Sequence, residues 1–389
     1  MDVAGEIEVE LAELERRDLR RHRRTIGGAQ GPEVRLGGRR VICLASNNYL
    51  GLAADAAVIA ASREALDALG LGSGASPLVS GHMEAHEALE REIAEWLGCE
   101  ASLLFGSGYH ANIGTIAALV GRGDEVFSDE LNHASLIDGC RLARARVTIY
   151  RHGDAEDLGV RLSASRARRR LVVTDSVFSM DGDRAPLAAI AEVAERHGAW
   201  VMVDEAHAIG VLGGTGAGLV EELELGPRIA VRMGTLGKAL GGYGAFVAGS
   251  RALIELLVNR ARAYVFSTAL PAAVVAGVRA AVAIARSDGE RRARLWRNAE
   301  RLREGLRAAG LGAPALGSSI VPLVLGEPRR ALAASRRLLE AGVLCPAIRP
   351  PTVPEGTARL RLTPIATHGD EQIDRAVEAI AEAVAASVA

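Results

Sequence analysis

The chain has 389 residues, a formal net charge of −2 and 49% hydrophobic residues. This length is too great for one simple core and predicts two domains with an appendage. Aromatic residues make up 3% of the chain and no basic block resembles a nucleic-acid-binding tail. The composition is therefore that of a soluble globular enzyme and argues against a nucleic-acid partner.

No apolar run reaches the roughly 18 residues of a transmembrane helix, so we expect no membrane association. The N-terminal stretch MDVAGEIEVELAELERR is acidic and amphipathic, unlike a secretory signal peptide. The cysteines show no CxxC spacing, which argues against a disulfide framework or a metal site and fits a reducing cytoplasm. They are Cys43, Cys99, Cys140 and Cys345.

The first half of the chain begins with helical spacing at 6–24, then a glycine-containing loop and a short strand at 41–46. From about residue 50 to 285, short apolar runs alternate with helical segments such as 83–97, 110–121 and 187–198. The runs are continuously apolar, as in buried strands of a mostly parallel sheet. They lie at 101–105, 125–129, 147–150, 170–175, 200–204, 229–233 and 244–249. The pattern predicts an α/β fold.

A smaller α+β domain is predicted to follow. It contains a long charged helix at 286–309, strands at 318–326 and 358–364, and helices at 328–341 and 369–387. The expected division is an N-terminal arm with a short strand at 1–48, a large α/β domain at 49–285 and a C-terminal domain at 286–389.

Lysine is almost absent from the composition. Of the 46 Lys and Arg residues, Lys238 is the single lysine and the other 45 are arginines. A lysine amine can lose its proton and attack a carbonyl, whereas a guanidinium stays protonated. An arginine-biased composition could leave one lysine by chance; the functional interpretation, which depends on the neighbouring residues, is that Lys238 carries pyridoxal 5′-phosphate (PLP) as a Schiff base.

The sequence around this lysine, GTLGKALGG (234–242), follows a predicted strand and is rich in small residues. A P-loop is the competing interpretation. It requires glycine at 232 and Ser or Thr at 239, where the chain has Arg232 and Ala239. The P-loop is therefore rejected, and the glycines indicate close approach of the backbone to a ligand.

The segment VMVDEAHAIG (201–210) resembles a helicase DEAH box. A helicase also needs a Walker A lysine upstream, and the chain has none. In a PLP enzyme, Asp204 at a strand end would keep the pyridine nitrogen protonated, and His207 would bond the phenolic oxygen. The structural alternative is that both residues cap a helix start.

Further polar residues follow other predicted strands. In FGSGYHAN (105–112), the backbone amides of Gly108 and Tyr109 at a helix start could bind the phosphate. Hydroxyls that could also reach it belong to Thr235, Ser267 and Thr268. Taken alone, the glycine-rich motif is a weak signal, because GxG after a strand is common.

Two more strand ends carry polar groups. His133 follows the strand at 125–129 and could stack on the ring or polarise a carbonyl, while Asp175 and Ser179 follow the strand at 170–175. Because ligands of open α/β sheets bind outside the carboxyl ends of the strands, one cofactor could use all these groups.

Five motifs together resemble the α-oxoamine synthases, PLP enzymes that condense an amino acid with an acyl-CoA thioester and release CO2. The resemblance covers nearly the whole chain and includes SNNYLGL (46–52), NHASLIDG (132–139), FSMDGD (178–183), VDEAH (203–207) and GTLGKALGG. It implies the PLP-dependent aspartate-aminotransferase fold (fold type I) and a homodimer with a shared active site.

Within that family, GSGASPLVSG (72–81) and AIRPPTVPEGTARLRLT (347–363) resemble the member that joins L-alanine to a pimeloyl thioester. That reaction gives 8-amino-7-oxononanoate, CO2 and a free thiol in biotin biosynthesis, with the acyl group on CoA or acyl carrier protein. TLGKALGG and NHASLIDG resemble 2-amino-3-ketobutyrate CoA ligase equally, so glycine with acetyl-CoA is an alternative. An aminotransferase of the same fold is a more distant one.

The resemblance also assigns roles to residues. Lys238 would hold PLP and take the Cα proton, His133 would stack on the ring and stabilise an oxyanion, and Ser267 and Thr268 would reach the neighbouring subunit's cofactor. The substrate residues would be Arg361 for the amino acid carboxylate with Asn47 nearby, Arg20 for the pimeloyl end, and Thr352 for the acyl chain.

Overall fold

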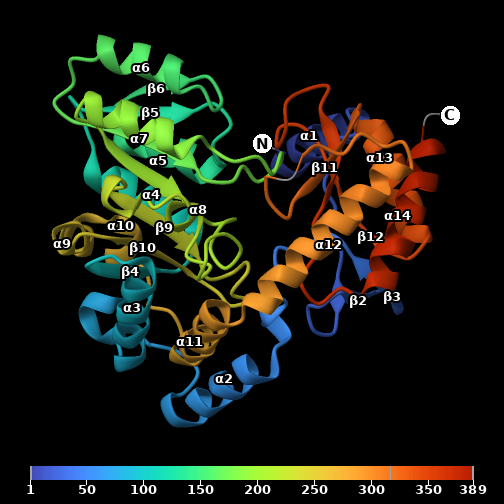
Figure 1. Cartoon of the computed structure of the whole chain (residues 1–389), viewed down its shortest axis with the longest axis horizontal. Helices are drawn as coiled ribbons and strands as arrows, with labels where there is room; N and C mark the ends of the chain where they lie inside the picture. Colours follow the sequence, from blue (N-terminus) through green and yellow to red (C-terminus); the bar gives the residue numbers. More distant parts are fainter. Residues whose placement is uncertain (1, 316, 388–389) are drawn as a thin grey trace. The chain divides into compact units, whose positions relative to one another are not determined.

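The computed structural model describes residues 2–315 and 317–387. Its chain forms two compact units, drawn in Figure 1. The large unit contains residues 47–179 and 183–293, and the small unit contains residues 1–46, 180–182 and 294–389. The chain therefore enters the small unit at both ends and once more in the short excursion at 180–182.

A seven-stranded sheet forms the centre of the large unit (Figure 1). Its order is β4-β10-β9-β8-β7-β5-β6, and β10 runs antiparallel to both neighbours while the remaining pairs are parallel. The predicted mostly parallel sheet is thereby confirmed. The strands are β4 (Ala101–Phe105), β5 (Glu125–Asp129), β6 (Arg146–Tyr150), β7 (Arg170–Asp175), β8 (Trp200–Asp204), β9 (Val231–Thr235) and β10 (Ala245–Gly249).

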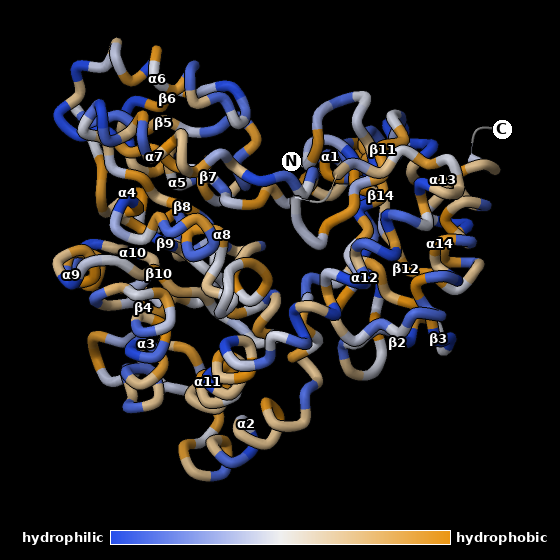
Figure 2. Tube along the Cα trace, viewed as in Figure 1, coloured by the Kyte–Doolittle hydropathy of each residue, from blue (hydrophilic) through white to orange (hydrophobic). Residues whose placement is uncertain are grey.

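Apolar residues of these strands form the core together with helices. Figure 2 shows apolar residues concentrated along the central strands, while most helices alternate between polar and apolar positions. Ile116, Leu136 and Leu257 of three helices pack in one buried cluster with strand residues. The helices are α2 (Ala56–Leu69), α3 (Glu84–Leu97), α4 (Gly108–Leu119), α5 (Ala134–Ala143), α6 (Ala155–Ala164), α7 (Leu187–Arg196), α8 (Leu219–Glu222), α9 (Arg251–Arg260), α10 (Arg262–Val265) and α11 (Ala272–Ser287).

The parallel strands place acidic side chains side by side at one edge of the sheet. Asp175 at the end of β7 and Asp204 at the end of β8 are register partners. Both are almost fully buried, with 3% of each exposed. Since the carboxyl ends of parallel strands share one edge, this edge collects the polar groups on which a ligand site can be built.

An internal ion pair connects the end of β8 with the start of β9. Arg232 of β9 donates to Glu205 at 2.9 Å and to the carbonyls of Leu97 and Ala217. Both charged side chains are buried, and burial raises the pKa of Glu205 while Arg232 opposes that rise. The guanidinium thus ties the residue next to Asp204 to the strand that leads to Lys238.

The small unit contains two small sheets with helices packed on them. The first has the order β1-β2-β3-β12 and the second has the order β11-β14-β13. Leu306, Leu338, Leu360 and Ile380 belong to its buried core. The elements are α1 (Val3–Arg16), β1 (Ile26–Gly27), β2 (Glu33–Leu36), β3 (Arg39–Cys43), α12 (Gly289–Ala308), β11 (Val321–Gly326), α13 (Pro328–Glu340), β12 (Val343–Leu344), β13 (Ala347–Ile348), β14 (Ala358–Leu362) and α14 (Asp370–Ala385).

The N-terminal helix is shorter than predicted. It ends at Arg16 instead of continuing to residue 24. Asp18 adopts a left-handed φ of 55°. The Arg349 guanidinium donates hydrogen bonds to the backbone carbonyls of Asp18 and Arg20. These carbonyls therefore accept from Arg349 instead of from backbone amides of a continuing helix, and the arginines after Arg16 lie outside the helix.

Among the described residues, no helix combines the length and the hydropathy that a bilayer span requires.

Candidate active site

The loop from β9 to β10 holds Lys238 in a fixed position. The Leu236 amide donates to the Gly244 carbonyl at 2.9 Å, and the Gly242 amide donates to the Leu236 carbonyl at 2.8 Å. Gly241 has φ of 66°, and a Cβ there would lie 2.2 Å from the Ala53 nitrogen. The glycines are thus required by positive φ and by close packing, and they give the lysine a defined base.

Lys238 belongs to a chain of polar contacts. Its Nζ lies 2.8 Å from Nε2 of His207, and Nδ1 of His207 lies 2.7 Å from the hydroxyl of Tyr49. The same hydroxyl donates to Oδ1 of Asn47 at 3.2 Å. The structure therefore brings together the predicted residues Lys238, His207 and Asn47. It adds Tyr49 of the SNNYLGL motif, for which the sequence indicated no role.

Asp204 is a buried carboxylate that accepts two hydrogen bonds. The Asn112 amide donates to Oδ2 at 2.7 Å, and the Ala206 backbone amide donates to Oδ1 at 2.9 Å. No ion pair among the described residues involves Asp204. Because a buried carboxylate is costly without a compensating cation, this donor set fits a protonated pyridine nitrogen.

Asp175 is a buried carboxyl whose pKa is raised. Burial, and then the nearby Asp204, raise the pKa of Asp175 well above its usual value. The His133 backbone amide donates to Asp175 at 2.8 Å and opposes that rise. Burial beside a second carboxyl thus favours the protonated form of Asp175.

His133 caps the start of α5, where its Nδ1 accepts from the Ser135 amide at 3.3 Å. Burial lowers the pKa of His133, and Asp204 raises it while Lys238 lowers it further. The net effect favours a neutral imidazole at neutral pH.

A helix start supplies the predicted phosphate site. Ser107 is the N-cap of α4 and accepts from the His110 amide at 3.2 Å, so Gly108 and Tyr109 are the first two helical residues. Their amides have no acceptor within the helix and suit an anion. A Cβ on Gly108 would lie 4.0 Å from Cβ of Thr235, whose hydroxyl accepts from the Gly237 amide at 3.2 Å. Thr235 and Gly108 are therefore neighbours.

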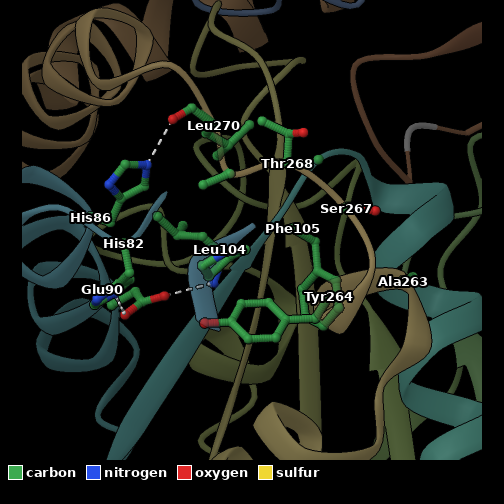
Figure 3. A pocket seen from close by; sticks show the side chains of 13 residues that line it. His82, His86, Glu90, Leu104, Phe105, Ala263, Tyr264, Ser267, Thr268 and Leu270 are labelled. Atoms are coloured by element: carbon green, nitrogen blue, oxygen red, sulfur yellow. Dashed lines mark hydrogen bonds and ion pairs between the residues drawn. The ribbon is translucent and has the colours of Figure 1, made fainter. Parts of the chain in front are cut away.

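Ser267 and Thr268 line a pocket next to this helix start, shown in Figure 3. Gly106, two residues before the helix, lines the same pocket. His82 lies on another wall, 3.1 Å from Glu90, which accepts from the Leu104 amide at 3.0 Å. The two hydroxyl residues thus lie beside the strand that leads into the predicted phosphate site.

The remaining predicted residues include three in the small unit. Arg361 is 8% exposed on β14, and Ser179 of the large unit directly precedes the 180–182 excursion. Thr352 accepts from the Arg21 guanidinium at 3.1 Å. Thr352 is therefore a partner of Arg21, while the guanidinium of Arg20, the residue predicted for the pimeloyl end, lies 3.7 Å from Glu15.

Taken together, these residues fit PLP. Lys238 would hold its carbonyl carbon, Asp204 its ring nitrogen, His207 its phenolic oxygen, and the amides of Gly108 and Tyr109 its phosphate. Among the described residues, no group of three or more His, Cys, Asp or Glu side chains could hold a metal ion.

Comparison with known proteins identifies the class. The family of class I and II aminotransferases matches residues 39–380. A serine palmitoyltransferase structure from Sphingomonas wittichii matches with a TM-score of 0.95 and 35% identity over 100% of this chain and 99% of that one. A serine palmitoyltransferase from S. paucimobilis with PLP bound matches with a TM-score of 0.95 and 33% identity over 100% of both chains. The chain belongs to this PLP-dependent family, which confirms the predicted fold and cofactor.

Relatives within the class narrow the assignment. The 8-amino-7-oxononanoate synthase of Anaeromyxobacter dehalogenans strain 2CP-1 is 54% identical over 96% of this chain and 94% of its own length. That of Methylococcus capsulatus is 53% identical over 96% and 97%. The structure of the Francisella tularensis enzyme matches with a TM-score of 0.76 and 27% identity over 90% and 99%. The chain belongs to the 8-amino-7-oxononanoate synthases, acyltransferases of biotin biosynthesis, as predicted.

A charged histidine braces the loops that carry His133 and Ser179. His152 lies 3.0 Å from Asp129 and 2.8 Å from Asp183, and its ring meets the Phe178 ring edge-on with 4.3 Å between centroids. The two carboxylates raise the pKa of His152 to about 10. The imidazolium thus connects the end of β5 with the 176–184 loop.

This brace predicts a pH-dependent stability. The pKa of His152 is about 10 in the folded protein and 6.5 for a histidine without these partners, as in the unfolded chain. Its stabilisation is therefore complete below about pH 6.5 and is lost as pH rises towards 10. We expect His152→Gln to lower the midpoint of urea unfolding clearly at pH 6 and progressively less towards pH 10. The unfolding is monitored by tryptophan fluorescence. The control is His22→Gln on an exposed histidine, and a constant difference for His152→Gln across this range would contradict the assignment.

Proposed function

We propose that this chain condenses L-alanine with a pimeloyl thioester, giving 8-amino-7-oxononanoate, CO2 and a free thiol in the cytoplasm. The observation that carries the chemistry is the cluster of Lys238, His207 and Asp204 at the ends of β8 and β9. The substrates rest on the name shared by relatives that are about half identical over nearly the full chain. The acyl group would be carried on CoA or on acyl carrier protein.

The protein residues divide the chemistry between them. When bound, PLP supplies a ring that accepts the electron pair left at the amino acid's Cα. Asp204 would keep the ring nitrogen protonated, and its burial makes that carboxylate a strong partner for a cation. Lys238 would take the Cα proton, since a lysine amine that has lost its own proton can act as a base.

His133 and His207 would act on oxygens. His207 lies between Lys238 and Tyr49, so both of its ring nitrogens have a polar neighbour, and it would bond the phenolic oxygen of bound PLP. His133, which burial keeps neutral, would stack on the ring and donate to the thioester carbonyl oxygen as negative charge develops there.

The substrate carboxylates call for arginines. We propose that Arg361 binds the alanine carboxylate, with Asn47 as a second partner. For the far end of the pimeloyl chain we propose Arg21 in place of Arg20, because Arg21 already donates to Thr352. Arg349 anchors this segment by holding two of its carbonyls.

The reaction can be tested directly. PLP-loaded protein with L-alanine and pimeloyl-CoA should release thiol and form 8-amino-7-oxononanoate. Lys238→Ala should lower the rate by about 10²- to 10⁴-fold, because both the covalent anchor and the Cα base are removed. Thiol release is followed with a disulfide reagent, and the product by mass spectrometry.

Two outcomes would change this assignment. A preference for glycine with acetyl-CoA would keep the family and overturn the substrates. Transfer of the amino group to an oxo acid without thiol release would indicate an aminotransferase. Carrier-bound pimeloyl substrate is compared with pimeloyl-CoA in the same assay.

The two N-terminal arginines form a matched pair. Arg21→Met should raise KM for the pimeloyl thioester by about 10- to 100-fold, since it removes a charged hydrogen bond, and should leave the KM for L-alanine unchanged. Arg20→Met should have a small effect on either constant. The reverse ranking, measured by steady-state kinetics, would restore Arg20 to the acyl site.

We propose that the enzyme is a homodimer with shared active sites. Exposed apolar side chains support this: Val79, Phe266 and Tyr243 are 79%, 70% and 58% exposed. Their segments are neighbours, because the Ala269 amide donates to the Ala75 carbonyl at 3.0 Å and a Cβ on Gly244 would lie 2.9 Å from Leu270. Ser267 and Thr268 lie on the same surface, so a second copy would meet them there.

A charge on this surface should separate the subunits. We expect the wild-type protein to have twice the 40.7 kDa chain mass in light scattering, and Val79→Asp to shift it towards the monomer with loss of activity. Val160→Asp is the matched control, because Val160 is 68% exposed on α6, away from these segments in the fold. An active monomeric wild-type enzyme would contradict the shared site.

A further inference from the structure

Two buried side chains connect Asp204 with His133. Asn112 of α4 is fully buried and Ser135 of α5 is 1% exposed. The Asn112 Nδ2 lies 2.7 Å from Asp204 Oδ2 and 2.8 Å from Ser135 Oγ. The Ser135 Oγ lies 2.7 Å from His133 Nδ1. Four side chains thus form one continuous line of hydrogen bonds.

The chemistry of the groups decides the direction of these bonds. A carboxylate only accepts, so Asn112 must turn its NH2 group towards Asp204. The second hydrogen of the same nitrogen then goes to the Ser135 hydroxyl oxygen. This orientation leaves Oδ1 of Asn112 without a partner among the described residues. A hydrogen bond to a charged carboxylate is stronger than one between neutral groups, which favours this orientation.

The last bond of the line fixes the proton on His133. Its Nδ1 lies 2.7 Å from the Ser135 hydroxyl oxygen and 3.3 Å from the Ser135 backbone amide, so the hydroxyl is the closer of the two possible donors and the amide is a long, weak one. Because the Ser135 oxygen already accepts from Asn112, its hydroxyl hydrogen is available for the same Nδ1. The ring proton of a neutral His133 must then be on Nε2.

We propose that Asn112 and Ser135 are positioning residues that hold His133 in the Nε2–H tautomer and tie it to Asp204. The catalytic consequence rests on the proposed function, in which His133 Nε2–H faces the thioester oxygen. The tautomer itself does not depend on the substrate. With the other tautomer, the nitrogen facing the reaction would be an acceptor and would repel a developing oxyanion.

The tautomer can be measured without turnover. In protein labelled with ¹⁵N-histidine, the ring nitrogen shifts distinguish Nε2–H from Nδ1–H, and the His133→Asn spectrum identifies the His133 signals. We expect Nε2–H in the wild type with and without PLP. Ser135→Ala should give a mixture of tautomers, and Ser135→Thr, which restores a hydroxyl, should return the wild-type signals.

Ser176→Ala is the matched control. Ser176 is also fully buried and donates to the backbone carbonyl of Asp204 at 3.1 Å, but it has no place in the line. Its removal should leave the His133 signals unchanged. If Ser135→Ala also leaves them unchanged, or if wild-type His133 carries its proton on Nδ1, the proposal is overturned.

Kinetics provides the second measurement. Ser135→Ala should lower kcat by about 2- to 10-fold, the value of one hydrogen bond, with KM for L-alanine unchanged, and Ser135→Thr should recover most of it. A shift in tautomer with no thiol-releasing activity in the wild type would leave the positioning role intact and reject the proposed reaction. If Ser135→Ala keeps the wild-type tautomer and the wild-type enzyme releases thiol normally, the positioning role is rejected and the proposed reaction stands.

Discussion

Burying a carboxylate at the end of a parallel strand costs free energy, and the residues around this site are arranged to compensate for that cost. Asp204 and its neighbour Glu205 are both almost fully buried, yet their environments differ. Glu205 turns to Arg232, so its charge is compensated within the protein. Asp204 turns to the sheet edge, where, within the part of the chain that the structure describes, it accepts hydrogen bonds from the Asn112 amide and one backbone amide. Such a carboxylate is prepared for a cation that the protein does not itself provide.

The other groups of the site follow from this edge of the sheet. Asp175 is the register partner of Asp204, and the like charges are separated by raising the pKa of Asp175. His133 is held over the same edge by Asp175 and Ser135, and burial keeps it neutral. The amine of Lys238 comes from the next strand and meets His207. One sheet edge therefore supplies an acid, a neutral donor and a nucleophilic amine from consecutive parallel strands.

Much of this arrangement could be predicted because it is local. Buried parallel strands have continuous apolar runs, and polar residues directly after them, such as Asp204 and Lys238, must lie at the carboxyl edge. The motif FGSGYHAN contained Asn112 and NHASLIDG contained Ser135, but neither residue type indicates a partner by itself. Spacing offered one signal: Asn112 follows Gly108 by one helical turn and so shares its face. The predicted N-terminal helix was too long because its true end depends on Arg349, more than 300 residues away.

The sequence by itself determined the class of fold, the residue that can form a covalent bond to a carbonyl, and the family. A single lysine among 45 arginines is informative because only the amine can lose its proton. Only the tertiary structure decided which residues are partners: Tyr49 with His207, Arg21 with Thr352, and Asn112 between Asp204 and Ser135. Hydrogen bonds between distant segments depend on distances of a few tenths of an ångström, which packing sets and residue order does not.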